Sequence, residues 1–324
     1  MSQFDLSLDQ LEGYRPALRR PLDFAEFWQS TLAQHGRAPL NVRVHQLHNE
    51  FVLIDTFDVE FAGFDGDPIK AWLWMPRGAP DPLPAVVEYV GYSGGRGYAS
   101  APSRWALSGY AHLLMDTRGQ GSGGSNGHTP DEMHGPAAPA VAGFMTRGIR
   151  DRETYYYRRL FVDAVRAVEV VRSLPQIDPR NVFVAGGSQG GGVSLAVSGL
   201  VRGLAGVMAE VPFLSHFERA ITITNSEPYA ELARYLASHR ADVELVLDTL
   251  SNFDVANFVD ASEAPALFSV GLMDEVTPPS TVFAAYNRYA GPKGIRVYPF
   301  NGHEGGGALH SELNVAWANS RLKQ

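Results

Sequence analysis

The chain has 324 residues, 45% hydrophobic and 11% aromatic, which is enough for a sizeable core and excludes a disordered protein. Its formal net charge of −8 disfavours nucleic acid or an anionic membrane as the main partner, and no apolar run approaches the roughly 18 residues of a membrane span. It contains no cysteine, which excludes disulfides and thiolate chemistry, and its first residues have no signal pattern, so we expect a cytoplasmic protein.

The first 83 residues are expected to form a helix and antiparallel strands. An amphipathic helix is predicted over 23–35, where large apolar side chains recur at helical spacing. Residues 51–61 and 69–75 alternate with the period of a strand and flank a hairpin turn. Trp72 and Trp74 share one face of the second strand, near a sheet edge that would otherwise lie open, so we expect them in the core or in a subunit contact.

From residue 84 onwards, apolar strands alternate with helices. Strands are predicted at 85–90, 110–115, 182–185, 206–211, 266–270 and 295–300, and helices at 159–173 and 307–322. This alternation predicts an α/β fold over 1–324 as a single domain, with a mostly parallel, doubly wound sheet covered by helices on both faces.

Two stretches interrupt the alternation. Residues 119–150 are rich in Gly, Pro, Ala and Ser and are too long for an ordinary connection, which indicates a functional or interface loop. Residues 215–258 are predicted to be helical and lie between two strands of the sheet, where a cap over an active site would be inserted.

The most informative pattern lies in residues 182–192. A β-rich run ends in Gly186-Gly187-Ser188-Gln189-Gly190 and a small-residue helix pattern follows. This Gly-x-Ser-x-Gly motif, which we call the elbow, places Ser188 on a sharp turn above the sheet edge, where its hydroxyl can act as a nucleophile if a base is near. The glycines at 186 and 190 let the backbone pass close to its neighbours. The alternative is a plain glycine-rich turn.

An acid and a histidine follow Ser188 in the order that a catalytic triad of this type requires. Asp274 comes after the strand predicted at 266–270, and His303 comes after the next one. Both therefore lie at the carboxyl edge of the sheet, where active sites gather. His303 would take the Ser188 proton, and Asp274 would fix the imidazole tautomer and stabilise the imidazolium.

The rival histidines and acids fit less well, because they lie in helices or strands, precede the elbow, or stand before or beside Asp274. They are His112, His128, His134, His216, His239, His310, Asp248, Asp254, Asp260 and Glu275.

Two backbone N–H groups are expected to form an oxyanion hole. One belongs to Gln189, directly after the nucleophile. The other belongs to Tyr92, in the loop 90–95 after the first parallel strand. The alternative for this loop is again a plain glycine turn.

Three other motifs lack a residue that their chemistry needs. Gly119–Gly124 fits G-x-G-x-x-G but is followed by Ser-Asn-Gly-His-Thr-Pro instead of a helix, which excludes a dinucleotide site. His303-Glu304 begins like a zinc-protease motif, but position 307 is glycine where the second histidine must stand. The glycines around Ser188 lack the lysine of a phosphate-binding loop.

Together the motifs resemble the acetyl xylan esterase / cephalosporin C deacetylase family (carbohydrate esterase family 7) of the α/β-hydrolase superfamily. The shared marks are Arg118-Gly119-Gln120, the elbow around Ser188 and His303-Glu304, in that order and at similar spacing over nearly the whole chain. The resemblance implies an α/β-hydrolase fold and a serine esterase that works without a cofactor. It implies removal of acetyl and other small acyl groups from acetylated xylo-oligosaccharides, cephalosporin C and related small esters.

The resemblance also implies a homohexamer with active sites facing an internal cavity. The loop 119–150 and the hairpin edge favour some closed homo-oligomer. Arg118 and Gln120 are then scaffolding residues: Arg118 pairs with an acid and Gln120 bonds to backbone near the elbow. One departure is Val90-Gly91-Tyr92, where the family has His-Gly-Tyr. The backbone donor survives this change, and any hydrogen bond from the histidine side chain is lost.

Two alternative functions remain open. A peptidase of the prolyl-oligopeptidase type shares the order of the triad, but the ~80 residues before the first parallel strand cannot form a propeller whose four-stranded blades need ~40–45 residues each. A non-catalytic binding protein with a hydrolase fold would typically lack one member of the triad, and all three residue types are present.

Overall fold

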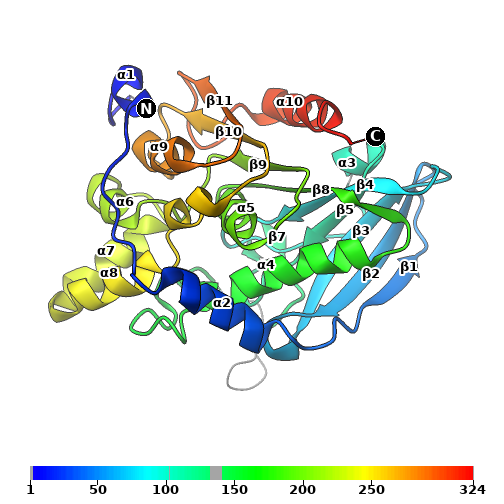
Figure 1. Cartoon of the computed structure of the whole chain (residues 1–324), viewed down its shortest axis with the longest axis horizontal. Coiled ribbons are helices and arrows are strands. Elements are labelled where there is room, and N and C mark those ends of the chain that lie inside the picture. Colours follow the sequence, from blue (N-terminus) through cyan, green and yellow to red (C-terminus); the bar gives the residue numbers. More distant parts are fainter. Residues whose placement is uncertain (1–2, 102, 132–140, 324) are drawn as a thin grey trace.

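A computed structural model describes residues 3–101, 103–131 and 141–323 (Figure 1). Its main feature is a nine-stranded sheet in the order β1-β2-β3-β5-β4-β8-β9-β10-β11. The strands are β1 (Arg43–Leu47), β2 (Ile54–Ala62), β3 (Pro68–Pro76), β4 (Leu83–Tyr89), β5 (Ala111–Met115), β8 (Ile177–Gly187), β9 (Gly206–Glu210), β10 (Ala266–Gly271) and β11 (Lys293–Tyr298). In this sheet order, every neighbouring pair from β5 through β4 to β11 is parallel, and every pair from β1 to β5 is antiparallel. The mostly parallel sheet is therefore confirmed.

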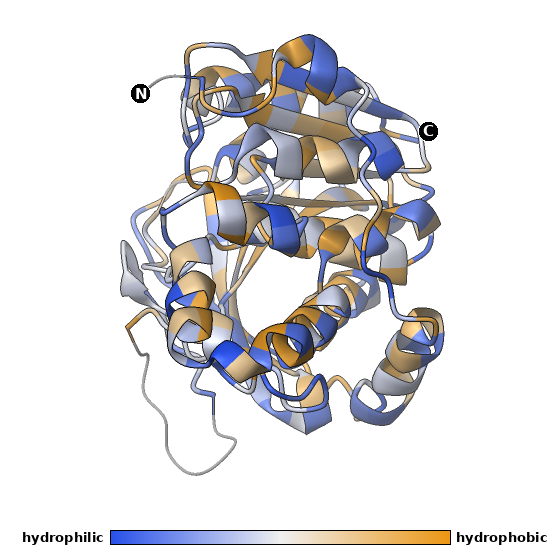
Figure 2. Cartoon of the chain, turned by 90° about the vertical axis from the view of Figure 1, so that its left-hand side faces the viewer, coloured by the Kyte–Doolittle hydropathy of each residue, from blue (hydrophilic) through white to orange (hydrophobic). Residues whose placement is uncertain are grey.

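Helices cover both faces of this sheet. They are α1 (Leu8–Glu12), α2 (Phe24–His35), α3 (Arg104–Leu107), α4 (Tyr156–Ser173), α5 (Gln189–Leu200), α6 (Phe217–Ile223), α7 (Tyr229–Ser238), α8 (Val243–Ser251), α9 (Pro279–Arg288) and α10 (Gly307–Asn319). Because successive side chains of a strand point to opposite faces, β8 sends Val182 and Val184 into a core shared with α4 and α5. It sends Phe183 and Ala185 towards α3 and α10. Figure 2 shows hydrophobic strand segments between the flanking helices.

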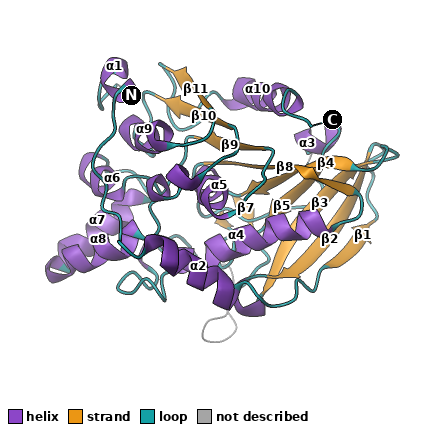
Figure 3. Ribbon diagram, in the orientation of Figure 1, coloured by secondary structure: helices purple, strands orange, loops and turns teal. Residues whose placement is uncertain are grey.

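The antiparallel strands do not leave Trp72 and Trp74 at an open edge, so that prediction is wrong. Their strand β3 pairs with β2 on one side and β5 on the other, and the edge belongs to β1 (Figure 3). Trp74 is 1% exposed and stacks on His112, and the Arg96 guanidinium lies 3.7 Å from the centroid of the Trp72 ring. β1 was not predicted because most of its side chains are exposed and show no apolar alternation.

The two interruptions of the sheet differ in structure. Residues 215–258, which we call the helical insertion, contain α6, α7, η3 (Arg240–Asp242), α8 and η4 (Val255–Asn257) between β9 and β10. The stretch 119–150 contains the small hairpin of β6 (Ser122–Gly123) and β7 (Ser125–Asn126), followed by η2 (Phe144–Thr146). Residues 132–140 of that stretch, including His134, lie outside the described residues. No helix in the described ranges is both long and apolar enough to cross a membrane.

Residues 3–22 run along the outside of the helical insertion and α9, and we call them the N-terminal strap (Figure 1). At one end, Asp5 accepts hydrogen bonds from the Ser280 N–H of α9 (2.7 Å) and from Arg219 of α6 (2.9 Å). At the other end, Arg19 forms ion pairs of 2.5–3.0 Å with carboxylates on α6 and α8: Glu218, Glu244 and Asp248. The strap therefore fastens the insertion to the rest of the molecule.

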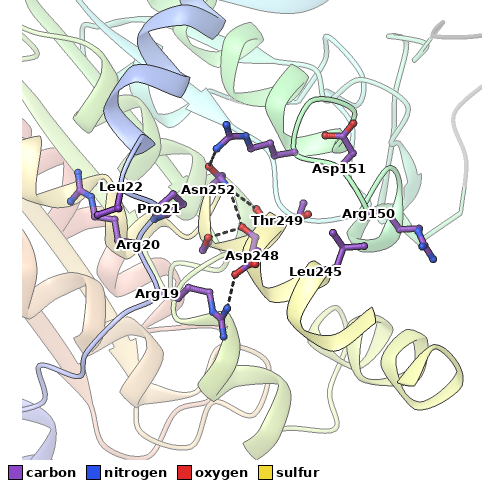
Figure 4. A pocket seen from close by; sticks show the side chains of 12 residues that line it. Arg19, Arg20, Pro21, Leu22, Arg150, Asp151, Leu245, Asp248, Thr249 and Asn252 are labelled. Carbon is purple, nitrogen blue, oxygen red and sulfur yellow. Dashed lines mark hydrogen bonds and ion pairs between the residues drawn. The ribbon is translucent and has the colours of Figure 1, made fainter. Parts of the chain in front are cut away.

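A cavity of about 510 Å³ lies beside this end of the strap (Figure 4). Its arginines are already paired with carboxylates: Arg19 as described, Arg20 with Asp260, Arg150 with Asp242 and Arg152 with Asp23. None of its lining residues belongs to the predicted catalytic set. The site of interest therefore lies elsewhere, at the carboxyl edge of the parallel strands.

Candidate active site

Ser188 is the single residue between the end of β8 and the start of α5. Its backbone has φ 55° and ψ −119°, a strained conformation for a residue with a side chain. The end of β9 and the segment after it hold Ser188 there, because its N–H donates to Glu210 O and its carbonyl accepts from Phe213 N, both at 2.9 Å. The elbow is thus fixed from the β9 side as well as by its own strand and helix.

Two glycines make the sharp turn possible. A Cβ on Gly186 would lie 2.4 Å from the Gly190 carbonyl carbon, and a Cβ on Gly190 would lie 2.0 Å from Tyr89 O. Either distance is far shorter than a contact between real atoms. The close backbone passage predicted for these two positions is therefore confirmed.

Asp274 and His303 are brought together from the loops after β10 and β11. His303 Nδ1 donates to Asp274 Oδ2 at 2.9 Å. The carboxylate is completely buried and also accepts from Val276 N (2.8 Å), Thr277 N (2.9 Å) and Thr277 Oγ1 (2.7 Å). These donors hold Asp274 as an oriented acceptor, which keeps the proton on Nδ1 of His303 and leaves Nε2 free to act as a base.

Ser188 lies at the same sheet edge, because β8, β9, β10 and β11 are successive parallel neighbours. In the described part of the chain the Ser188 hydroxyl makes no hydrogen bond. The link between Asp274 and His303 is therefore a contact of this structure, whereas proton transfer between Ser188 and His303 stays a prediction.

The two expected oxyanion donors are unoccupied by other partners. Within the described residues, neither the Tyr92 N–H nor the Gln189 N–H donates a hydrogen bond. Gly91 brings the loop after β4 beside the elbow, since a Cβ there would be in ordinary contact, 3.9 Å from Gly187 O. Backbone donors with no internal acceptor beside a nucleophile are what an oxyanion hole requires.

A pair of buried glutamine side chains supports the loop that carries Tyr92. Gln189 Nε2 donates to Val90 O at 3.2 Å, and Gln120 Oε1 accepts from Ser93 N at 2.7 Å. The two amides also bond to each other at 3.0 Å. The expected bond from Gln120 to backbone near the elbow is confirmed. The role of the Gln189 side chain was missed, because only its main-chain N–H belongs to the elbow motif.

Comparison with known families identifies the chain. The model of the family described as acetyl xylan esterase (AXE1) matches residues 1–321. The chain belongs to this family. Membership places it among carboxylic ester hydrolases and agrees with the resemblance seen in its motifs.

Two solved structures of acetyl xylan esterases are similar over almost their whole length. The enzyme from Paenibacillus sp. R4 is 38% identical, with a TM-score of 0.91 over 98% of this chain and 100% of that one. Acetyl xylan esterase 1 from Thermoanaerobacterium sp. JW/SL YS485 is 30% identical, with a TM-score of 0.89 over 99% of this chain and 100% of that one.

A curated relative, acetyl esterase Axe7A of Xylanibacter ruminicola, is 29% identical over 301 residues. The alignment covers 90% of this chain and 65% of Axe7A, so the chain spans about two thirds of the length of that relative. The substrates of the relatives are therefore considered for this chain only as a proposal.

Arg118, a mark of the acetyl xylan esterase family, is buried, and its contacts are structural rather than catalytic. Its guanidinium bonds to both carboxylate oxygens of Asp163 on α4 (2.5 and 2.8 Å) and pairs with Asp67 at 3.0 Å. The predicted pairing of Arg118 with an acid is confirmed. The arginine joins the loop after β5 to helix α4.

Glu231, on α7 of the helical insertion, has a place in the site that the sequence did not reveal. Its Oε1 accepts a 2.6 Å hydrogen bond from the Tyr92 hydroxyl. Burial raises the pKa of the Tyr92 phenol, so it stays a donor. No local motif marks Glu231, because the contact spans 139 positions of the sequence.

The rival residues have other partners. Among the described histidines, only His303 contacts Asp274. His216 and His239 lie at helix ends rather than within helices as expected, whereas His310 lies within α10 and His112 within β5. Glu275 is exposed beside buried Asp274, and Asp254 accepts backbone bonds from His216, Phe217 and Ala256.

Proposed function

We propose that this member of the acetyl xylan esterase family is a serine esterase that uses Ser188, His303 and Asp274 as its triad. Its substrates are small acetylated esters, such as acetylated xylo-oligosaccharides and cephalosporin C. The observation that carries the proposal is the buried, fully bonded Asp274 holding His303 at the sheet edge where strained Ser188 lies. The acetyl esterase activity named for the relatives supports it.

The mechanism follows from the atoms available. His303 Nε2 takes the Ser188 hydroxyl proton while Oγ attacks the ester carbonyl carbon. The tetrahedral oxyanion accepts hydrogen bonds from the Tyr92 and Gln189 N–H groups. Collapse breaks the bond to the alcohol, which leaves with the proton held by His303, and the acyl group stays on Ser188. A water molecule activated by His303 then releases acetate and restores Ser188.

The acyl group is expected to be small because aromatic side chains crowd the hole. The Tyr92 ring meets Phe144 and Phe213 edge-on, at centroid distances of 5.5 and 6.1 Å. Phe213 is itself bonded to Ser188 through its N–H. Each methylene that fits poorly against this wall should cost ~1–3 kcal/mol, so acetyl esters should be favoured over longer chains.

A series of p-nitrophenyl esters tests both parts of the proposal. We expect Ser188→Ala and His303→Ala each to reduce kcat by ~10⁴-fold or more, and their combination to add little, because the triad acts as a unit. Near-normal turnover by Ser188→Ala would exclude the serine mechanism. A preference of the wild type for octanoate over acetate would exclude the deacetylase assignment and indicate a lipase-like pocket.

The remaining features of the proposal concern the setting of the enzyme. It works without a cofactor on a small soluble ester, in the cytoplasm, as a closed homo-oligomer. The cysteine-free composition supports the location, and the family resemblance supports the assembly. A peptidase or a non-catalytic binding protein is less well supported, because the matching family is one of esterases.

A further inference from the structure

The Tyr92 hydroxyl is a junction between three segments that are distant in sequence. It donates to Glu231 Oε1 of α7 at 2.6 Å and accepts from the N–H groups of Phe144 (2.9 Å) and Gly143 (3.3 Å). Glu231 Oε2 in turn accepts from Met145 N at 3.2 Å. One phenol and one carboxylate thus join the loop after β4 to the helical insertion and to the segment around η2.

These contacts complete the fixation of the loop that carries the Tyr92 N–H. The main chain is held on one side by Gln189, which bonds Val90 O, and on the other by Gln120, which bonds Ser93 N. Backbone bonds add to this hold, since Gly94 N donates to Gly91 O at 3.1 Å and Ser93 O accepts from the N–H groups of Gly121 and Gly123 at 3.1 and 3.0 Å. The main chain is thus held on both sides of Tyr92, and Tyr92 itself is anchored through its side chain, by the bonds of its hydroxyl to Glu231, Gly143 and Phe144.

Glu231 is a buried acceptor for the Tyr92 hydroxyl. It is 8% exposed, and burial raises the pKa of its carboxyl while the hydrogen bond from Tyr92 opposes that rise. The Tyr155 hydroxyl, completely buried within the electrostatic reach of Tyr92 and Glu231, makes no hydrogen bond among the described residues. Among the described residues, the Glu231 carboxylate is therefore the acceptor that the Tyr92 hydroxyl uses.

We propose that Glu231 is a positioning residue: by accepting the Tyr92 hydroxyl hydrogen bond it aims the Tyr92 N–H at the oxyanion and holds the Tyr92 ring as the wall of the acyl pocket. This inference rests on the proposed esterase function. It assigns the helical insertion a part in transition-state stabilisation.

The test compares Glu231→Gln, Tyr92→Phe and the double variant with Glu244→Gln as the matched control. Glu244 is an exposed glutamate of the same insertion that pairs with Arg19 and does not touch the loop. Removing one oxyanion donor costs ~10²–10³ in kcat, so a misaimed donor should lower kcat for p-nitrophenyl acetate by about 10-fold or more, with KM changed by less than about 3-fold. The double variant should be no slower than the slower single one, because both break the same bond.

Two further measurements separate positioning from mere stability. The rate of inactivation by diethyl p-nitrophenyl phosphate, whose P=O oxygen must enter the same hole, should fall in parallel with kcat. In these variants the ratio of activity on the acetate ester to activity on the butyrate ester should decrease, because the Tyr92 ring is no longer held in place as the wall of the acyl pocket. Melting temperatures are recorded for every variant, and Glu244→Gln should keep wild-type kcat and inactivation rate.

The outcomes are distinct. If Glu231→Gln and Tyr92→Phe retain wild-type kcat and inactivation rate, or if their effects multiply in the double variant, the positioning role is wrong. If Glu231→Gln does not fold, Tyr92→Phe alone decides, since it removes one oxygen atom. Failure of the esterase proposal would show itself separately, as turnover that survives Ser188→Ala.

Discussion

At the scale of single residues, the elbow works because one strained serine is flanked by glycines of unequal importance. Ser188 has φ 55°, and its neighbours at 186 and 190 leave no space for a side chain. At Gly187 the situation differs, since a Cβ would be 3.9 Å from the Glu210 Cβ and would meet nothing closer. The motif therefore contains two glycines required by packing and one that is not.

This contrast gives a prediction for Gly186→Ala and Gly187→Ala. The first should lower the free energy of unfolding by about 3 kcal/mol or prevent folding, because the new methyl group overlaps backbone that cannot move. The second should change it by less than about 1 kcal/mol. Urea unfolding followed by circular dichroism measures both. Equal effects of the two substitutions would contradict the packing described for the elbow.

The residues that sequence patterns predict are those whose partners are set by local motifs. The flanking glycines identify Ser188 in the sequence, and the strand ends that precede them identify Asp274 and His303. No such pattern identifies Glu231. Its contact with Tyr92 forms only when α7 of the insertion packs beside that residue, and nothing in the sequence around position 231 indicates the contact. The buried side-chain role of Gln189 escaped for the same reason.

At the scale of elements, helix α4 is held by charges as well as by its apolar stripe. It is buried along most of its length yet carries Arg159, Asp163 and Arg166. Arg159 pairs with Asp131 at 2.8 Å, and Arg166 donates to Ala62 O at 3.0 Å. These bonds, together with the pair of Asp163 and Arg118, tie the helix to the loops around it.

The buried pair should be costly to break. Arg118→Met leaves the Asp163 carboxylate without its partner, so we expect the free energy of unfolding to fall by about 3–5 kcal/mol. Arg180→Ala is the matched control, because Arg180 is 63% exposed in its pair with Asp178 and an exposed ion pair contributes little to stability. Chemical unfolding of the two variants checks this, and a similar small loss for both would contradict a structural role of Arg118.

Prediction of elements succeeded where side-chain patterns are strong. The strands β4, β5, β8, β9, β10 and β11 are apolar and alternate with helices, and that order predicts a parallel sheet. The edge strand β1 lacks a buried face, so its place follows only from pairing with β2, and the expected position of Trp72 and Trp74 at an edge failed with it.

At the scale of the whole molecule, two buried histidines make folding sensitive to acid. His216 stands at the start of α6 and His310 within α10. Burial, reinforced by nearby arginines, lowers the pKa of each to about 4. In the unfolded chain a histidine titrates near pH 6.5. Between about pH 6.5 and pH 4 the unfolded state therefore binds more protons than the folded state, and the free energy of unfolding decreases as the pH is lowered.

The prediction is that each of these histidines lowers the free energy of unfolding by about 2 kcal/mol between pH 7 and pH 5. Urea unfolding of the wild type and of His310→Gln at both pH values tests it, since comparison of the two proteins cancels the contribution of other groups. The variant should lose about 2 kcal/mol less over this range. An identical pH dependence of both proteins would contradict the assignment.

Assembly is the second property at this scale. The short, exposed and partly charged β1 covers the β2–β3 hairpin, so the expected open edge at Trp72 and Trp74 no longer supports association. The family resemblance still predicts a closed homo-oligomer, with a hexamer favoured. Light scattering at micromolar concentration measures it. A monomer would mean that the loop 119–150 has another role.

The N-terminal strap has a kinetic consequence. A segment that bonds α6 and α9 at one end and α6 and α8 at the other should resist a swing of the helical insertion as a hinged lid. If Ser188 is the nucleophile as proposed, we expect substrate to reach it without waiting for a gate to open. Selectivity would then come from the fixed shape of the site rather than from closure around the substrate.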